Sequence, residues 1–115
     1  MDSSYQELRT KVAADGGLHV VAMGVLRDIQ GAGRLGNRVL GTISKHLESH
    51  GMGHIPAELP GNQDSPVRIY FLGTPIADTV NAILSPSPKG DAILRDMGDS
   101  EAREQLRQIR EIVRA

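Results

Sequence analysis

Residues 35–51 read LGNRVLGTISKHLESHG and show the most regular pattern in the chain. Large apolar side chains recur there at steps of four, at Leu35, Val39, Ile43 and Leu47. Residues four apart lie on one face of an α-helix, so this spacing predicts a helix over residues 35–50 with one buried side. Gly51 follows at the position where a left-handed residue commonly ends a helix.

The N-terminal residues predict another helix. Ser3 or Ser4 can cap it, and Glu7 lies three residues after Ser4, as in a capping box. The sequence DGG at residues 15–17 then predicts the end of this helix near Ala14.

A short apolar run and a second helical pattern lie between these two helices. Residues 18–23 (LHVVAM) predict a buried strand around His19–Ala22. The same run could instead open the next helix, because residues 23–30 (MGVLRDIQ) continue with helical spacing and periodicity does not separate the two. Three apolar residues of that helix share one side: Val25, Leu26 and Ile29. The glycines of residues 31–33 predict a turn.

The residues after Gly51 predict a β-hairpin. MGHI (52–55) and VRIYFLG (67–73) read as its strands, and the proline- and glycine-rich residues 56–66 form its long loop. In the second strand, apolar Val67, Ile69 and Phe71 alternate with Arg68 and Tyr70.

A further helix and a linker follow the hairpin. Thr74 can cap the helix, Pro75 suits its first position, and it would end near Ser85. Its apolar stripe consists of Ile76, Ala77, Val80, Ile83 and Leu84. Residues 85–90 (SPSPKG) predict a linker, and residues 91–97 a helical turn.

Asp99 or Ser100 can cap a final helix that runs to the C-terminus. Its apolar seam has 4-3-4 spacing and consists of Ala102, Leu106, Ile109 and Val113. So narrow a seam must be buried against something. We expect a homodimer or a protein partner there, with packing on the chain's own core as the alternative. The predicted domains are therefore residues 1–85, and residues 86–115 as linker and C-terminal helix.

The composition excludes several kinds of protein and site. The chain has 115 residues, a net charge of −1 and no cysteine, so disulfides, thiolate zinc sites and cysteine nucleophiles are absent. No apolar run approaches the roughly 18 residues of a membrane span. Residues 1–15 are too polar for a signal peptide, which makes a cytoplasmic protein the expectation.

In chain order, these elements resemble the winged helix-turn-helix superfamily over residues 3–72. The segments that carry the likeness are MGVLRDIQ for the second helix, GAGRLG for the turn, LGNRVLGTISKHLESHG for the recognition-type helix, and GHI and VRIYFLG for the wing strands. The likeness lies in topology and in no signature motif. It implies a mostly helical α+β fold, with a helix-strand-helix-helix-strand-loop-strand core followed by two further helices.

The resemblance also implies a site for duplex DNA, because the third helix of such domains enters the major groove and the wing contacts the backbone. Arg38 and Asn37 would read base edges and Lys45 and Arg34 would hold phosphates. Gly41 would allow close approach. The remaining candidates are Thr42 on the helix, with Gln63 and Arg68 on the wing.

We therefore expect a non-enzymatic DNA-binding protein, such as a transcriptional regulator. The alternatives are a plain solvated helix face, or a protein-interaction module that uses the hairpin and the C-terminal helix. Glu48 lies on the same helix face and would repel phosphates.

Two sharper interpretations carry less weight. His46, His50 and His54 recur at steps of four, as metal ligands can, but histidines that hydrogen-bond local carbonyls explain them better. The glycines of GAGRLG precede a helix without the lysine-serine ending of a phosphate loop. No nucleophile-elbow motif is present. We expect no catalytic residues, no metal and no cofactor.

Overall fold

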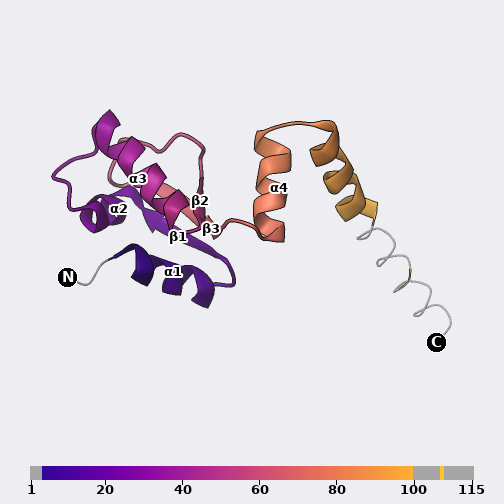
Figure 1. Cartoon of the computed structure of the whole chain (residues 1–115), viewed down its shortest axis with the longest axis horizontal. Coiled ribbons are helices and arrows are strands. Elements are labelled where there is room, and N and C mark those ends of the chain that lie inside the picture. The colour runs from indigo at the N-terminus through magenta and orange to yellow at the C-terminus, as the bar shows by residue number, and fades with distance from the viewer. Residues whose placement is uncertain (1–3, 100–106, 108–115) are drawn as a thin grey trace. The chain divides into compact units, whose positions relative to one another are not determined.

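The computed structural model describes residues 4–99 and Arg107 of the chain. Those residues form an α+β fold, as predicted, and in its N-terminal part three helices lie beside a small antiparallel sheet (Figure 1). Contacts divide the chain into two compact units, Met1–Ala77 and Asp78–Ala115. This division falls before the boundary after residue 85 that the sequence predicts.

Helix α1 (Tyr5–Ala14) begins and ends as predicted. Ser4 is its N-cap, and the Ser4 Oγ accepts a hydrogen bond from the Glu7 N–H at 3.2 Å. Gly16 and Gly17 follow with φ of 75° and 99°, a left-handed backbone that glycine adopts without strain. The buried residues of α1 are Tyr5, Leu8 and Val12.

Strand β1 (Leu18–Ala22) runs directly into helix α2 (Met23–Gln30). The run LHVVAM therefore supplies both a strand and the first residue of a helix. The N-cap, Ala22, has no side chain that could accept a hydrogen bond. Instead, the N–H groups of Met23 and Gly24 donate to carbonyls in the loop at residues 63–65, each at 2.9 Å.

Helix α2 buries a narrower side than predicted. Met23 and Leu26 are buried and Ile29 is partly buried, whereas Val25 is 40% exposed. A helix of eight residues makes only about two turns, and few positions of so short a helix face the core. Gly31 ends it with φ of 77°, which confirms the predicted glycine turn.

Helix α3 (Asn37–Ser49) is the predicted helix of residues 35–50, with a later start. Gly36 has an extended backbone and acts as the N-cap, so Leu35 packs on the core from outside the helix. Ile43 and Leu47 are fully buried, as their spacing predicts. Gly51 follows with φ of 74°.

Strands β2 (Met52–Ile55) and β3 (Pro66–Phe71) form the predicted hairpin. The sheet order is β1-β3-β2, and both pairings are antiparallel. Helices α1, α2 and α3 cover one face of this sheet. The side chains that meet there as one core include Leu8, Leu26, Ile43, Leu47, Met52, Val67 and Ile69.

Tyr70 departs from the predicted alternation of β3. It is buried, although it lies on the face opposite Val67 and Ile69. Its ring lies across its partner in register, Gly53, where an added Cβ would come within 2.5 Å of the Tyr70 Cζ. The missing side chain of Gly53 thus makes room for Tyr70.

Helix α4 (Pro75–Leu84) begins as predicted, with the Ala77 N–H donating to the Thr74 Oγ at 3.3 Å. Its predicted stripe is wrong at two positions, because Ile83 is 60% exposed and Leu84 is also exposed. Among its other residues, Val80 and Ala82 are buried.

The predicted linker is shorter than SPSPKG, since residues 88–99 are helical. The Ser87 Oγ caps this helix by accepting from the Gly90 N–H at 3.0 Å. Asp99 is itself helical, so it is not the cap of a new helix. Ser100 and the predicted seam lie outside the described residues: Ala102, Leu106, Ile109 and Val113. Within the described part of the chain, no helix is both long and apolar enough to cross a membrane.

Candidate nucleic-acid interface

The outer surface of α3, with the turn before it, carries the predicted cations. Arg34, Arg38 and Lys45 are exposed, and no acidic residue occurs between residues 29 and 47. Arg38 and Lys45 are seven residues apart, about two helical turns, so they share one side of α3. Within the described residues, none of the three forms an ion pair. We call this surface the α3 basic face, made of Arg34, Asn37, Arg38, Gly41, Thr42 and Lys45.

Gly41 lies in the middle of this face without a structural reason to be glycine. It is exposed, its φ is not positive, and an added Cβ would meet no atom within 4 Å beyond the helix itself. Glycine inside a helix costs roughly 0.5–1 kcal/mol relative to alanine. The fold therefore does not require glycine at this position. Close approach of a ligand backbone to the helix would require it.

The two polar residues beside the cations, Thr42 and Asn37, differ in their surroundings. The Thr42 Oγ donates to the Arg38 carbonyl at 3.0 Å, so its hydroxyl proton is already used. Asn37 lines the rim of a pocket of about 300 Å³ beside α3, together with Gly41 and Glu58. The acidic residue nearest in sequence to Lys45 is Glu48, which is also exposed. Negative charge thus borders the α3 basic face.

Gln63 does not lie on the α3 basic face, because its loop is attached to α2. Its Oε1 accepts from the Arg27 Nη1 at 2.5 Å, and its carbonyl accepts from the Gly24 N–H at 2.9 Å. A Cβ on Gly24 would come within 3.3 Å of that carbonyl, so the glycine permits the contact. Residues 56–66 contain two acids and no lysine or arginine. The loop therefore adds no positive charge.

Arg68 lies on the other face of the sheet. Its neighbours Val67 and Ile69 are fully buried under the helices, and side chains alternate along a strand. The exposed Arg68 side chain therefore leaves the sheet on the side away from α3. Five of the six residues of the α3 basic face lie on α3 and Arg34 lies in the turn before it, whereas Gln63 and Arg68 belong to other elements.

The rings of His50 and His54 hydrogen-bond local carbonyls, as predicted, whereas within the described residues the His46 ring makes no such bond. The His50 Nδ1 lies 2.7 Å from the His46 carbonyl, and the His54 Nδ1 lies 2.7 Å from the Pro56 carbonyl. The Tyr5 ring stacks on His50 at 5.2 Å between ring centroids and contacts His46 at 5.4 Å. Among the described residues, no three histidine, aspartate or glutamate side chains are grouped as metal ligands would be.

The 300 Å³ pocket also contains a serine-histidine pair that no pattern in the sequence predicts. The Ser44 Oγ lies 2.8 Å from the His54 Nε2. A carbonyl only accepts, so the Pro56 carbonyl requires a proton on Nδ1 and leaves Nε2 to accept from the Ser44 hydroxyl. Ser44 lies mid-helix, where backbone N–H groups are used within the helix and do not stabilise an oxyanion. We interpret the pair as a link between α3 and β2.

Arg9 is a second residue whose role the sequence does not reveal. Its guanidinium donates to the His50 carbonyl and lies over the Phe71 ring, 5.0 Å from the centroid. These partners are far away in the sequence, so no local pattern indicates them. Arg9 thus joins α1 to the end of α3 and to β3.

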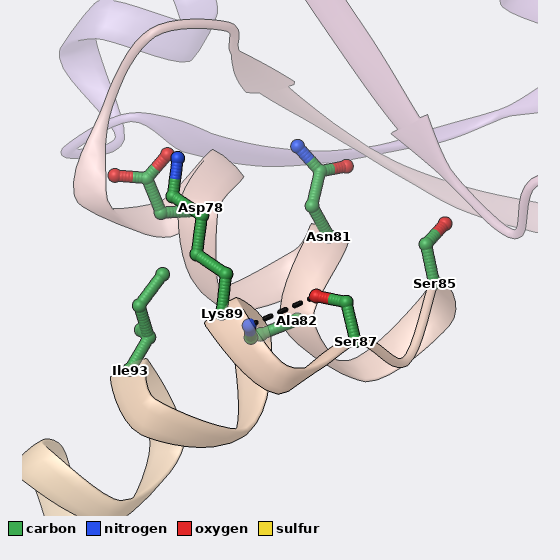
Figure 2. Close-up of a pocket in the computed structure, with 8 residues that line it drawn as sticks. Asp78, Asn81, Ala82, Ser85, Ser87, Lys89 and Ile93 are labelled. Carbon is green, nitrogen blue, oxygen red and sulfur yellow. Dashed lines mark hydrogen bonds between the residues drawn. The ribbon is translucent and has the colours of Figure 1, made fainter.

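The second unit contains a small pocket between α4 and the helix of residues 88–99 (Figure 2). Asp78, Asn81 and Lys89 line it, and its volume is about 180 Å³. Sites for drug-sized ligands are usually about 300–1,000 Å³. The Ser87 hydroxyl in this pocket already caps its own helix. The pocket is therefore too small for a drug-sized ligand, and its Ser87 hydroxyl is already used. The α3 basic face is the stronger candidate site.

Comparison with known proteins adds no family to this picture. No protein-family model, no curated protein and no solved structure matches the chain. The functional argument therefore rests on the order of elements and on the chemistry of the α3 basic face.

Proposed function

We propose that the chain is a non-enzymatic winged-helix protein that binds duplex DNA through the α3 basic face, as a transcription regulator would. Two features support the winged-helix assignment. The elements follow the order α1, β1, α2, α3, β2, β3, and the sheet has the order β1-β3-β2. In this class of domain, the helix after the turn inserts into the major groove.

The observation that carries the DNA proposal is the group of three exposed, unpaired cations on one helix and the turn before it. The groove of a DNA duplex has phosphates on both sides, which can be reached by Arg34, Arg38 and Lys45. Gly41 has no side chain and so allows the helix to come close to the groove. Asn37 and Arg38, in the first turn of α3, are the base-reading candidates. Protein-interaction modules need no such group of cations.

The same geometry predicts weak, strongly salt-dependent binding. The loop of residues 56–66 and Arg68 contribute no charge beside α3, so about three phosphate contacts remain. At about 0.9 per phosphate, log K should fall against log salt with a slope of about −2.7.

The test is fluorescence anisotropy of labelled duplex DNA between about 50 and 200 mM salt. The double variant Arg38→Ala with Lys45→Ala should reduce the magnitude of the slope by about 2 and weaken binding at low salt. The matched control is Lys11→Ala with Arg68→Ala, which removes the same charge from exposed residues outside α3.

The control should keep the slope of the unmodified protein. Equal loss in both double variants would show that only net charge matters and would remove the role of α3. Absence of any binding at low salt would overturn the DNA proposal and favour the protein-interaction alternative.

A further inference from the structure

Strand β1 is an edge of the sheet, and one hydrogen bond tells which of its backbone groups face outward. The Met23 N–H donates to the Ser65 carbonyl at 2.9 Å, in the same register that pairs β1 with β3. In an antiparallel pair, hydrogen-bonded and non-hydrogen-bonded positions alternate. His19 and Val21 therefore bond to β3, whereas the N–H and C=O groups of residues 18, 20 and 22 face away from it.

Nothing in β1 protects this edge. Proteins usually block edge strands with charged side chains, proline or a bulge. The strand LHVVA has no lysine, arginine, acid or proline, and its register with β3 is continuous. Leu18 is 39% exposed and Val20 is 51% exposed. Within the described residues, no hydrogen bond reaches the outward backbone groups of Leu18 or Val20.

The opposite edge of the sheet is different. Strand β2 packs beside α3, and its outward residue His54 is held by Ser44 and by the Pro56 carbonyl. The outer side of β2 is thus next to α3, and the His54 side chain there is held by two hydrogen bonds. The outward backbone groups of Met52 and His54 in β2 also have no hydrogen bond among the described residues, but Met52 is buried and His54 is partly buried, whereas Leu18 and Val20 of β1 are exposed.

We propose that β1 pairs with β1 of a second copy of this chain. The two strands would run antiparallel about a two-fold axis at Val20 and join two three-stranded sheets into one. This register pairs all five residues of both strands. The outward groups of residues 18, 20 and 22 could form about six hydrogen bonds between the two strands. Two of these would need the Ala22 carbonyl of each strand, which already accepts a bond from the first turn of α2, so about four remain.

Self-complementarity is the reason for choosing a second copy as the occupant. The register places Val20 opposite Val20 of the partner subunit, and Leu18, a large side chain, opposite the small Ala22 of the partner subunit. No charge in the strand meets its own copy, which would be unfavourable. The nearest acid, Asp15, is turned to the His19 ring, 2.6 Å from its Nδ1.

The first experiment measures the mass of the full chain in solution by sedimentation over a concentration series. The unmodified protein should dimerise. Val20→Lys should raise the dimer dissociation constant at least about tenfold, because it places two like charges opposite each other. Leu72→Lys is the matched control: Leu72 is 40% exposed and lies outside β1, so that variant should still dimerise.

The second experiment uses the absence of cysteine from the chain. Paired residues of an antiparallel ladder have Cα atoms about 5.5 Å apart, within reach of a disulfide. Val20→Cys should form a disulfide-linked dimer under mild oxidation, and Leu72→Cys should not. This readout does not depend on the effect of a lysine on folding.

Three outcomes would overturn the proposal. The first is a monomer at every concentration. The second is equal cross-linking of Val20→Cys and Leu72→Cys. The third is a dimer that survives Val20→Lys and is lost in Leu106→Glu with Ile109→Glu, which would assign the interface to the C-terminal seam. DNA binding is measured separately, so failure of either proposal leaves the other standing.

Discussion

Helices α3 and α4 have similar apolar patterns but different surroundings. In α3, Ile43 and Leu47 are fully buried, and the opposite side carries the cations. In α4, Ile83 and Leu84 belong to the same kind of stripe but are exposed. Helical periodicity therefore predicts that a helix forms and which side chains share a face. Whether that face is buried depends on which residues from elsewhere in the chain pack against it.

The largest effect is expected where the apolar face is buried. Leu47→Ala should destabilise the protein by about 2–5 kcal/mol, because it leaves a cavity in the core. Ile83→Ala in α4 is the matched control, and its effect should stay within about 0.5 kcal/mol, as for exposed positions. Urea unfolding of both variants measures the difference. Equal losses would show that Ile83 is buried in solution.

A smaller effect tests the hydrogen bond between α1 and α2. The Tyr5 hydroxyl donates to the Gln30 Oε1 at 2.7 Å, while the Tyr5 ring packs on His46 and His50 of α3. Tyr5→Phe keeps the ring and should cost about 0.5–1.5 kcal/mol at neutral pH. Urea unfolding at pH 7 measures this loss.

The same tyrosine should make stability fall at alkaline pH. Burial raises the pKa of Tyr5 from 10.0 to about 12, so the folded state holds the proton more tightly than the unfolded state. Its contribution is complete below pH 10 and is lost as the pH rises from 10 through about 12. Tyr5→Phe should reduce this dependence. Burial also raises the pKa of Tyr70, so part of the dependence should remain. An unchanged pH profile in Tyr5→Phe would contradict the assignment.

The smallest effect belongs to the solvent side of α3. Gly41→Ala should stabilise the protein by about 0.5–1 kcal/mol, because the fold leaves room for the methyl group and alanine suits a helix better. If DNA approaches the helix at Gly41, the same variant should bind duplex DNA more weakly. Thermal unfolding and anisotropy together separate the two effects. A variant that gains stability and keeps full DNA binding would show that Gly41 is not at the contact.

Much of the fold could be predicted from local patterns. The Ser4 cap, the glycine that ends α3 and the hairpin after it all depend on neighbouring residues, and the structure agrees with each. The hydrogen bonds of His50 and His54 to nearby carbonyls are local in the same sense. The spacing of Leu35 predicts that it lies inside α3, but Gly36 has an extended backbone and the helix starts after it.

The candidate site was only partly predictable. Residues of one helix share a face by geometry, so the α3 basic face follows from the sequence once the helix is known. Gln63 and Arg68 come from other elements, and their positions depend on long-range contacts. Arg27 and Gly24 hold Gln63 against α2, and the strand register turns Arg68 away from α3.

The sequence by itself determined the order of the helices and strands and several of their ends, because caps, glycines and apolar spacing act over a few residues. Only the tertiary structure decided which surfaces are free. Tyr70 is buried because Gly53 lies beside it, and Ile83 is exposed although its spacing favours burial. The open edge of β1 also appears only in the folded sheet. Burial and strand order depend on residues far apart in the chain, and a local pattern contains no information about them.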